Sequence, residues 1–136
     1  MRAVLLKMVP KKIIKLMIVD DSNIIRQRIA RAVVAGKISN MTVAAMAKNG
    51  VVAIDMCQEH MPDIVTMDLT MPEMGGVICI QKLLKIKPDV MILVVSALSD
   101  KATALKALEL GAYGFLCKPF TDDQLADALN ELMEDT

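Results

Sequence analysis

The chain of 136 residues has few aromatic side chains: one tyrosine, two phenylalanines and no tryptophan. It also lacks net charge, because sixteen basic residues balance sixteen acidic ones. Proteins that bind nucleic acid usually carry an excess of Lys and Arg, so the neutral balance predicts no nucleic-acid partner. The hydrophobic core must then be built from aliphatic residues and methionine, a composition typical of a buried parallel sheet.

Features of secreted and membrane proteins are scarce as well. The three cysteines, Cys57, Cys79 and Cys117, show neither close pairing nor metal-ligand spacing. We interpret them as reduced core thiols, with a redox role for Cys117 as the alternative. No apolar run approaches the roughly 20 residues of a membrane helix, and residues 3–6 are too short for a signal-peptide core. We therefore expect a cytoplasmic protein with no membrane insertion.

What the sequence does contain is a set of short apolar runs that end in polar residues. Asp20 and Asp21 follow residues 16–19, and Asp68 follows residues 64–67. Ser96 and Lys118 come at the ends of two further runs, residues 91–95 and 113–117. Each run has the length and composition of a buried parallel strand. Because such strands place their carboxyl ends at one edge of a sheet, we expect these polar side chains to lie together.

Helical periodicity alternates with the apolar runs. Residues 41–46 form a second predicted strand, and five amphipathic stretches separate or follow the strands. Gly36 and Gly111 are expected to end two of the helices, and the last is expected to begin at Thr121 with Gln124 completing a capping box. Its buried stripe is Leu125, Ala128, Leu129 and Leu132, and that of the preceding helix is Ala104, Ala107 and Leu108. Five strand–helix units predict an α/β domain with a doubly wound parallel sheet.

The grouped polar residues predict a site for a divalent metal and a phosphoryl group. Carboxylates crowded together repel one another unless a cation neutralises them. Ligands that are all oxygen suit Mg²⁺. One carboxylate could then attack phosphorus, since aspartate is a known nucleophile in aspartyl-phosphate formation. Lys118 offers a compact positive charge, and Ser96 offers a hydroxyl donor to the same group.

These residues, in this order, resemble the receiver domain of two-component response regulators. The acidic pair corresponds to Asp20 and Asp21, and the phospho-acceptor corresponds to Asp68, in a segment that runs to Gly76. Ser96 and Lys118 occupy the hydroxyl and basic positions. The resemblance covers residues 15–133 and divides the chain into an N-terminal extension, residues 1–14, and a receiver domain, residues 15–136. It implies the flavodoxin-like fold with strand order 2-1-3-4-5.

The resemblance also implies a function. A histidine kinase or a histidine phosphotransfer protein would phosphorylate Asp68, with Mg²⁺ held by Asp20, Asp21, Asp68 and the backbone carbonyl of Thr70. Ser96 and Phe115 would act as the switch residues, and the peptide bond between Lys118 and Pro119 would be cis. With no output domain after the last helix, the protein would signal by binding a downstream target protein and would not be an enzyme. We expect a monomer, with a dimer through the fourth and fifth helices as the alternative.

Other interpretations stay open. The protein could be a phosphorelay intermediate that passes the phosphoryl group on, because such proteins share the same site. It could be a pseudo-receiver whose interactions do not depend on phosphate, although a scaffold has no need of three crowded carboxylates. An aspartate-nucleophile phosphatase usually has a second acid two residues after the nucleophile, where this chain has Thr70. The pattern also departs from the commonest receivers at Leu98, two residues after Ser96, and at Gly75–Gly76.

Overall fold

The computed structural model describes residues 12–134, in which strands and helices alternate along the chain. The strands are β1 (Ile14–Val19), β2 (Met41–Ala47), β3 (Ile64–Met67), β4 (Met91–Ala97) and β5 (Gly114–Lys118). The helices are α2 (Asn23–Val34), α3 (Gly50–His60), α4 (Gly76–Ile86), α5 (Lys101–Glu109) and α6 (Asp122–Glu134), and a short 3₁₀ turn, η1 (Leu98–Asp100), joins β4 to α5.

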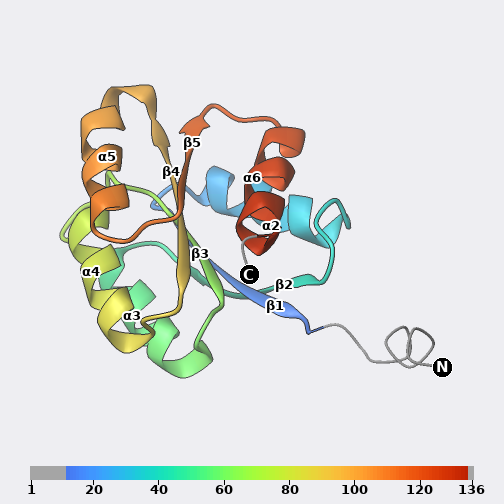
Figure 1. Ribbon diagram of the computed structural model, residues 1–136, viewed down its shortest axis with the longest axis horizontal. Coiled ribbons are helices and arrows are strands. Elements are labelled where there is room, and N and C mark those ends of the chain that lie inside the picture. The colour runs from blue at the N-terminus through green and yellow to red at the C-terminus, as the bar shows by residue number, and fades with distance from the viewer. Residues whose placement is uncertain (1–11, 135–136) are drawn as a thin grey trace.

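The five strands form one parallel sheet in the order β2-β1-β3-β4-β5, which confirms the predicted order (Figure 1). The register aligns the carboxyl ends of the central strands. Val19 at the end of β1 pairs with Met67 at the end of β3, and Met67 in turn pairs with Val94 of β4. The residues that follow β1 and β3 therefore emerge side by side at one edge of the sheet.

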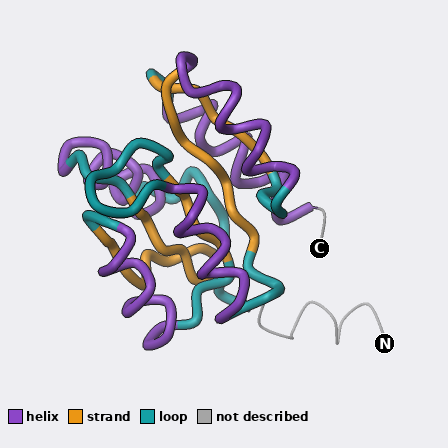
Figure 2. The backbone as a smooth tube through the Cα atoms, turned by 90° about the vertical axis from the view of Figure 1, so that its left-hand side faces the viewer, coloured by secondary structure: helices purple, strands orange, loops and turns teal. Residues whose placement is uncertain are grey.

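Helices cover both faces of the sheet (Figures 1 and 2). One hydrophobic cluster joins strand residues such as Met17 and Val65 to α3, α4 and α5. A second cluster joins the alternate strand residues, such as Leu16 and Ile64, to α2 and α6. Because successive side chains of a strand point to opposite faces, the central strands need apolar residues at every position. This requirement explains the uninterrupted apolar runs in the sequence.

Side-chain caps fix the starts of three helices. The Ser22 hydroxyl accepts a hydrogen bond from the Ile25 N–H (3.3 Å), and the Asn49 side chain accepts one from the Val52 N–H (2.9 Å). At α6 the Gln124 N–H donates to the Thr121 hydroxyl (3.1 Å), and the Thr121 N–H donates to the Gln124 side chain (2.9 Å). This reciprocal pair confirms the predicted capping box.

Element boundaries differ from the prediction in detail. β4 continues to Ala97, so Ser96 lies within the strand and not after it, and β5 begins at Gly114, one residue later than predicted. Leu108 is exposed, since it lies on the solvent flank of the stripe that Ala104 and Ala107 bury. Ala128 is only half-buried.

Most of the expected N-terminal extension lies outside the described residues. Ile14, which was assigned to that extension, is the first residue of β1 and pairs with Met41. Among the helices of residues 12–134, none combines the length and apolarity that a membrane-spanning helix needs.

Candidate functional site

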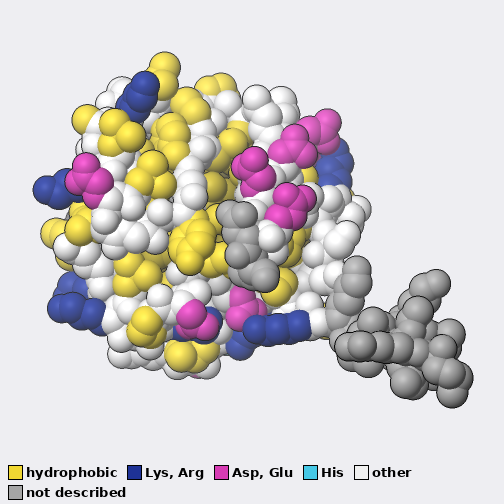
Figure 3. Space-filling model, in the orientation of Figure 1, with side chains coloured by type: hydrophobic (Ala, Val, Ile, Leu, Met, Phe, Trp, Pro, Cys, Tyr) yellow, Lys and Arg dark blue, Asp and Glu magenta, His cyan; other side chains and the backbone are white. Residues whose placement is uncertain are grey.

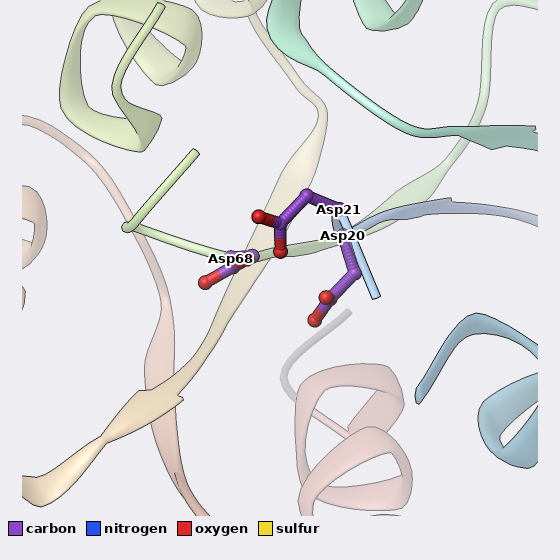
Figure 4. A group of neighbouring side chains, drawn as sticks. All are labelled: Asp20, Asp21 and Asp68. Carbon is purple, nitrogen blue, oxygen red and sulfur yellow. The ribbon is translucent and has the colours of Figure 1, made fainter. Parts of the chain in front are cut away.

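Three aspartates meet where β1 and β3 end (Figure 4). The Asp20 N–H donates to the Ala47 carbonyl (3.1 Å), and the Asp68 N–H donates to the Val19 carbonyl (2.9 Å). These bonds continue the sheet pairing beyond the strands and fix where both side chains emerge. Carboxylate oxygens of Asp20, Asp21 and Asp68 all lie within 4.8 Å of one another. Asp20 and Asp68 are buried, whereas Asp21 is exposed.

The environment of Asp68 disfavours its charged form. Burial is the main cause, and the neighbouring Asp20 carboxylate adds to it; together they raise the pKa of Asp68 to about 6. The Lys118 ammonium and the Thr70 N–H, which donates to Asp68 Oδ1 (3.2 Å), oppose this shift. The cluster therefore holds more negative charge than its own groups compensate, and a bound cation would relieve the excess.

Lys118 reaches this cluster from the end of β5. The peptide bond between Lys118 and Pro119 is cis, as predicted. The Lys118 Nζ lies 2.8 Å from Asp20 Oδ2 and 3.6 Å from Asp68 Oδ1. The sequence predicted that Lys118 would offer a positive charge to the phosphoryl group; the structure places its ammonium near Asp68 and in shorter contact with Asp20. One ammonium thus bridges two of the three carboxylates.

Asp20 is held in place by the start of α2. Its Oδ1 accepts a hydrogen bond from the Ser22 N–H (2.9 Å), and its backbone carbonyl accepts one from Arg26 Nη1 (2.6 Å). Sequence reasoning missed Arg26. The only available signal was its position one turn into the helix that follows the acidic pair, and an arginine there is ordinary on an exposed helix face.

Ser96 and Thr70 both donate to an acid that sequence reasoning also missed. The Ser96 hydroxyl donates to Asp100 Oδ2 (2.7 Å), and the Thr70 hydroxyl donates to the same oxygen (3.2 Å). Asp100 is the last residue of η1 and directly precedes α5. Six of the residues around the resulting pocket, whose volume is about 450 Å³, are Asp21, Asp68, Thr70, Ser96, Asp100 and Lys118. The predicted site residues are thus brought together, with Phe115 further away on β5.

Comparison with known protein families agrees with this geometry. The sequence profile described as the response regulator receiver domain matches residues 16–130, most of the chain. The chain belongs to this receiver family.

Two chemotaxis relatives are matched over nearly their whole length. It is 37% identical over 118 residues to the chemotaxis protein CheY of Thermotoga maritima, covering 87% of this chain and 96% of that protein. It is 34% identical over 119 residues to CheY of Bacillus subtilis, covering 88% and 97%. Among solved structures, the response regulator domain of Thermotoga maritima CheB superposes with a TM-score of 0.79 at 29% identity, covering 91% of this chain and 96% of that one.

The donor set of this receiver fits Mg²⁺. Asp20, Asp21 and Asp68 offer only oxygen ligands, and the exposure of Asp21 leaves room for water, which Mg²⁺ retains when it binds proteins. Thr70 is exposed and immediately follows the Asp68–Leu69 pair. The role of its backbone carbonyl as a Mg²⁺ ligand stays a prediction. The soft ligands that favour zinc or copper are absent from this three-residue cluster, although other parts of residues 12–134 contain cysteine.

Phe115 and the three cysteines are the other residues to which the sequence analysis gave roles. Phe115 is half-buried, pairs in register with Val94 and packs against the cluster beneath α3, α4 and α5. All three cysteines, each within the described residues, are free thiols. Burial, with a smaller contribution from Cys57, raises the pKa of Cys79 to about 12, so this thiol stays protonated at neutral pH. Cys117 is half-buried, and its Sγ contacts the Lys118 carbonyl (3.3 Å).

Proposed function

We propose that this receiver is a response regulator that accepts a phosphoryl group on Asp68 and then binds a partner protein. The phosphoryl donor would be a histidine kinase or a histidine phosphotransfer protein. The observation that carries this proposal is the surroundings of Asp68: two further carboxylates with oxygens within 4.8 Å and an ammonium 3.6 Å away. A buried scaffold residue would not be expected to keep such a costly arrangement of like charges.

Each residue has a chemical part in the transfer. A carboxylate oxygen of Asp68 forms the new bond to phosphorus, and the bond between phosphorus and the donor breaks. The electron pair of that bond returns to the donor atom, which takes a proton from solvent. Lys118 stabilises negative charge on the phosphoryl oxygens, and Ser96 supplies a hydroxyl donor once its own bond to Asp100 is released.

Mg²⁺ would be held by Asp20, Asp21, Asp68 and the Thr70 carbonyl. When bound, it would neutralise the clustered carboxylates and the charge of the incoming phosphoryl group. Asp20 is prepared for this task because the Ser22 N–H and the Lys118 ammonium already fix its two carboxylate oxygens.

Incubation with acetyl phosphate and Mg²⁺, followed by intact-protein mass spectrometry, tests the assignment. The wild-type chain should gain one phosphoryl group, and Asp68→Asn should gain none while remaining folded. Asp55→Asn, which removes an exposed acid on α3, is the matched control and should behave like the wild type. An ordinary adduct on Asp68→Asn would contradict the proposal. A pseudo-receiver would form no adduct at all, and a phosphatase would consume many equivalents of donor.

The partner would bind the face formed by α5, β5 and α6. On the side seen in Figure 3, hydrophobic side chains lie over α5 and acidic side chains gather over α6. Leu105 and Leu108 on α5 and Tyr113, directly before β5, are exposed. The chemotaxis relatives support direct signalling by a cytoplasmic protein over onward phosphoryl transfer. Mixing the phosphorylated chain with a histidine phosphotransfer protein would reveal the phosphorelay alternative as loss of the adduct to that protein.

A further inference from the structure

The Ser96 hydroxyl is committed to Asp100 in this structure. Ser96 is 1% exposed, and its Oγ lies 2.7 Å from Asp100 Oδ2. A serine hydroxyl carries a single proton, so it can donate to only one strong acceptor at a time. While it donates to Asp100, it cannot donate to a phosphoryl oxygen on Asp68. The bond to a carboxylate is also charge-assisted, which makes it stronger than a bond between neutral groups.

Thr70 extends the same contact to the loop after β3. Its hydroxyl lies 3.2 Å from the Asp100 oxygen that Ser96 already contacts. Thr70 is two residues from Asp68, and its N–H donates to Asp68 Oδ1. A single carboxylate oxygen therefore joins the end of β4 to the loop that carries the phospho-acceptor.

The side-chain contacts of Asp100 are unusual for an aspartate that directly precedes a helix. An acid there normally caps the helix by accepting a bond from a backbone N–H of the first turn. Within the described residues, Asp100 makes no such side-chain bond to α5. Its carboxylate instead lines the pocket that also contains Asp68 and Lys118. The Asp100 carboxylate therefore contacts the site and does not cap its own helix.

We propose that Asp100 is a positioning residue that holds Ser96 and Thr70 in the unphosphorylated arrangement and releases them when Asp68 is phosphorylated. This inference rests on the proposed function. A phosphoryl group on Asp68 adds negative charge to a pocket that already contains Asp21, Asp68 and Asp100, with Lys118 as the opposing charge. Repulsion then favours withdrawal of the Asp100 carboxylate, which frees the Ser96 hydroxyl and shifts the start of α5.

Two substitutions at Asp100 separate its charge from its hydrogen bonds. Asp100→Ala removes both, whereas Asp100→Asn removes the charge and keeps an oxygen that can accept from Ser96. We expect Asp100→Ala to raise the initial rate of adduct formation with acetyl phosphate and Mg²⁺ by about tenfold, and to raise the affinity for beryllofluoride similarly. Asp100→Asn should give a smaller increase in both. Thermal unfolding would confirm that each variant is folded.

Asp89→Asn is the matched control. It removes one acid and a contact with Lys87 (3.2 Å) at the opposite end of β4, and its rate should equal that of the wild type. A second comparison uses Ser96→Ala, which removes the hydroxyl that Asp100 holds. In that background Asp100→Ala should raise the rate clearly less than it does when Ser96 is present, because only the charge and the Thr70 contact are left to remove. An equal increase in both backgrounds would overturn the part assigned to Ser96.

Two results would overturn the role of Asp100 altogether. One is an unchanged rate and beryllofluoride affinity in both Asp100 variants. The other is a loss of Mg²⁺ affinity with slower adduct formation, which would make Asp100 part of the metal site. Either result, with a normal adduct on the wild type, leaves the proposed function intact. Absence of an adduct on the wild type would instead refute the proposed function and this inference together.

Discussion

At the residue scale, Asp68 is placed where its charge is unfavourable in the absence of a ligand. The residue is 3% exposed and faces a second buried carboxylate, Asp20. Lys118 contacts both carboxylates, but one ammonium cannot neutralise three acids. The site therefore gains from any cation that enters it. A group whose pKa is raised by folding also makes the stability of the protein depend on pH.

Asp68→Asn should stabilise the metal-free protein at neutral pH. Burial and Asp20 raise the pKa of Asp68 from 3.8 to about 6. Its contribution to stability is therefore fully present below pH 3.8 and is lost as the pH rises through 6. Asparagine has nearly the same shape and no charge, so the variant avoids that loss. We expect it to be more stable by about 1–3 kcal/mol at pH 7.5, measured by urea unfolding with a chelator present.

Two further measurements make this expectation specific. The advantage of Asp68→Asn should shrink as the pH is lowered from 6 toward 3.8, because the wild-type carboxyl then binds its proton in the native state. Saturating Mg²⁺ should raise the stability of the wild type more than that of the variant, because binding to the native state adds to its stability. A variant less stable than the wild type at pH 7.5 without metal would show that charge repulsion does not govern this position.

At the scale of elements, α4 begins against the backbone of the phospho-acceptor loop. The Gly76 N–H donates to the Leu69 carbonyl (3.0 Å). A Cβ atom at Gly76 would lie 2.6 Å from the Asp68 carbonyl oxygen and 2.7 Å from the Leu69 Cα. Both neighbours are backbone atoms, which cannot move aside as a flexible side chain would. Gly76 therefore lets the helix approach the loop that positions Asp68.

Gly76→Ala should lower stability and slow adduct formation together. The new methyl group must displace either the start of α4 or the backbone of Asp68, and we expect a loss of about 1–3 kcal/mol. The matched control is Gly75→Ala, because a Cβ there meets nothing closer than 3.9 Å and the backbone φ of −66° suits alanine. That variant should change stability by less than about 1 kcal/mol. Equal effects of the two substitutions on urea unfolding would contradict the packing argument.

The order of elements could be predicted because each central strand is an apolar run that ends in a characteristic polar residue. Asp20, Asp68 and Lys118 mark the ends of their strands directly in the sequence. The pairing of β1 with β3 could not be read from those runs, since an apolar run does not specify its neighbour. It followed from the resemblance to receivers. β4 passes Ser96 and ends at Ala97, because a buried serine can remain in a strand when its hydroxyl finds an acceptor.

Contacts that depend on the direction of a side chain could not be predicted from the sequence. An aspartate before a helix predicts a cap, and the local sequence around Asp100 contains nothing against that interpretation. Its carboxylate turns to Ser96 and Thr70 only because the fold brings the ends of β3 and β4 together. Arg26 was missed for a similar reason, since its partner is the backbone carbonyl of Asp20.

At the scale of the whole molecule, the site is joined to the proposed partner face through the pairing of β4 with β5. Ser96 pairs with Cys117, and Val94 pairs with Phe115. Side chains two residues apart on a strand share a face, so Ser96 and Phe115 lie on the same side of the sheet. Phe115 and Tyr113 both line a pocket of about 380 Å³ beside α6. A movement of Ser96 therefore has a short structural path to the ring of Phe115.

Phosphorylation should shift the ring of Phe115 between two positions that already exist in the free protein. A phenylalanine can enter the space left by Ser96 and the following loop without needing a hydrogen-bond partner, unlike a tyrosine. The inward rotamer should therefore be appreciably populated without phosphate, and a phosphoryl analogue should favour it further.

Because the chain has few aromatic residues, the shift of the Phe115 ring can be measured. The chain has only two phenylalanines, so fluorine-labelled phenylalanine gives two NMR signals. Phe120 is 2% exposed beneath Arg28, whose guanidinium carbon lies 4.9 Å from the ring centroid, and it serves as the internal control. On addition of beryllofluoride and Mg²⁺, the Phe115 signal should move in the wild type but not in Asp68→Asn, while the Phe120 signal stays in place. An unmoved Phe115 signal at saturating analogue would mean that Ser96 and the η1 turn carry the change without the ring.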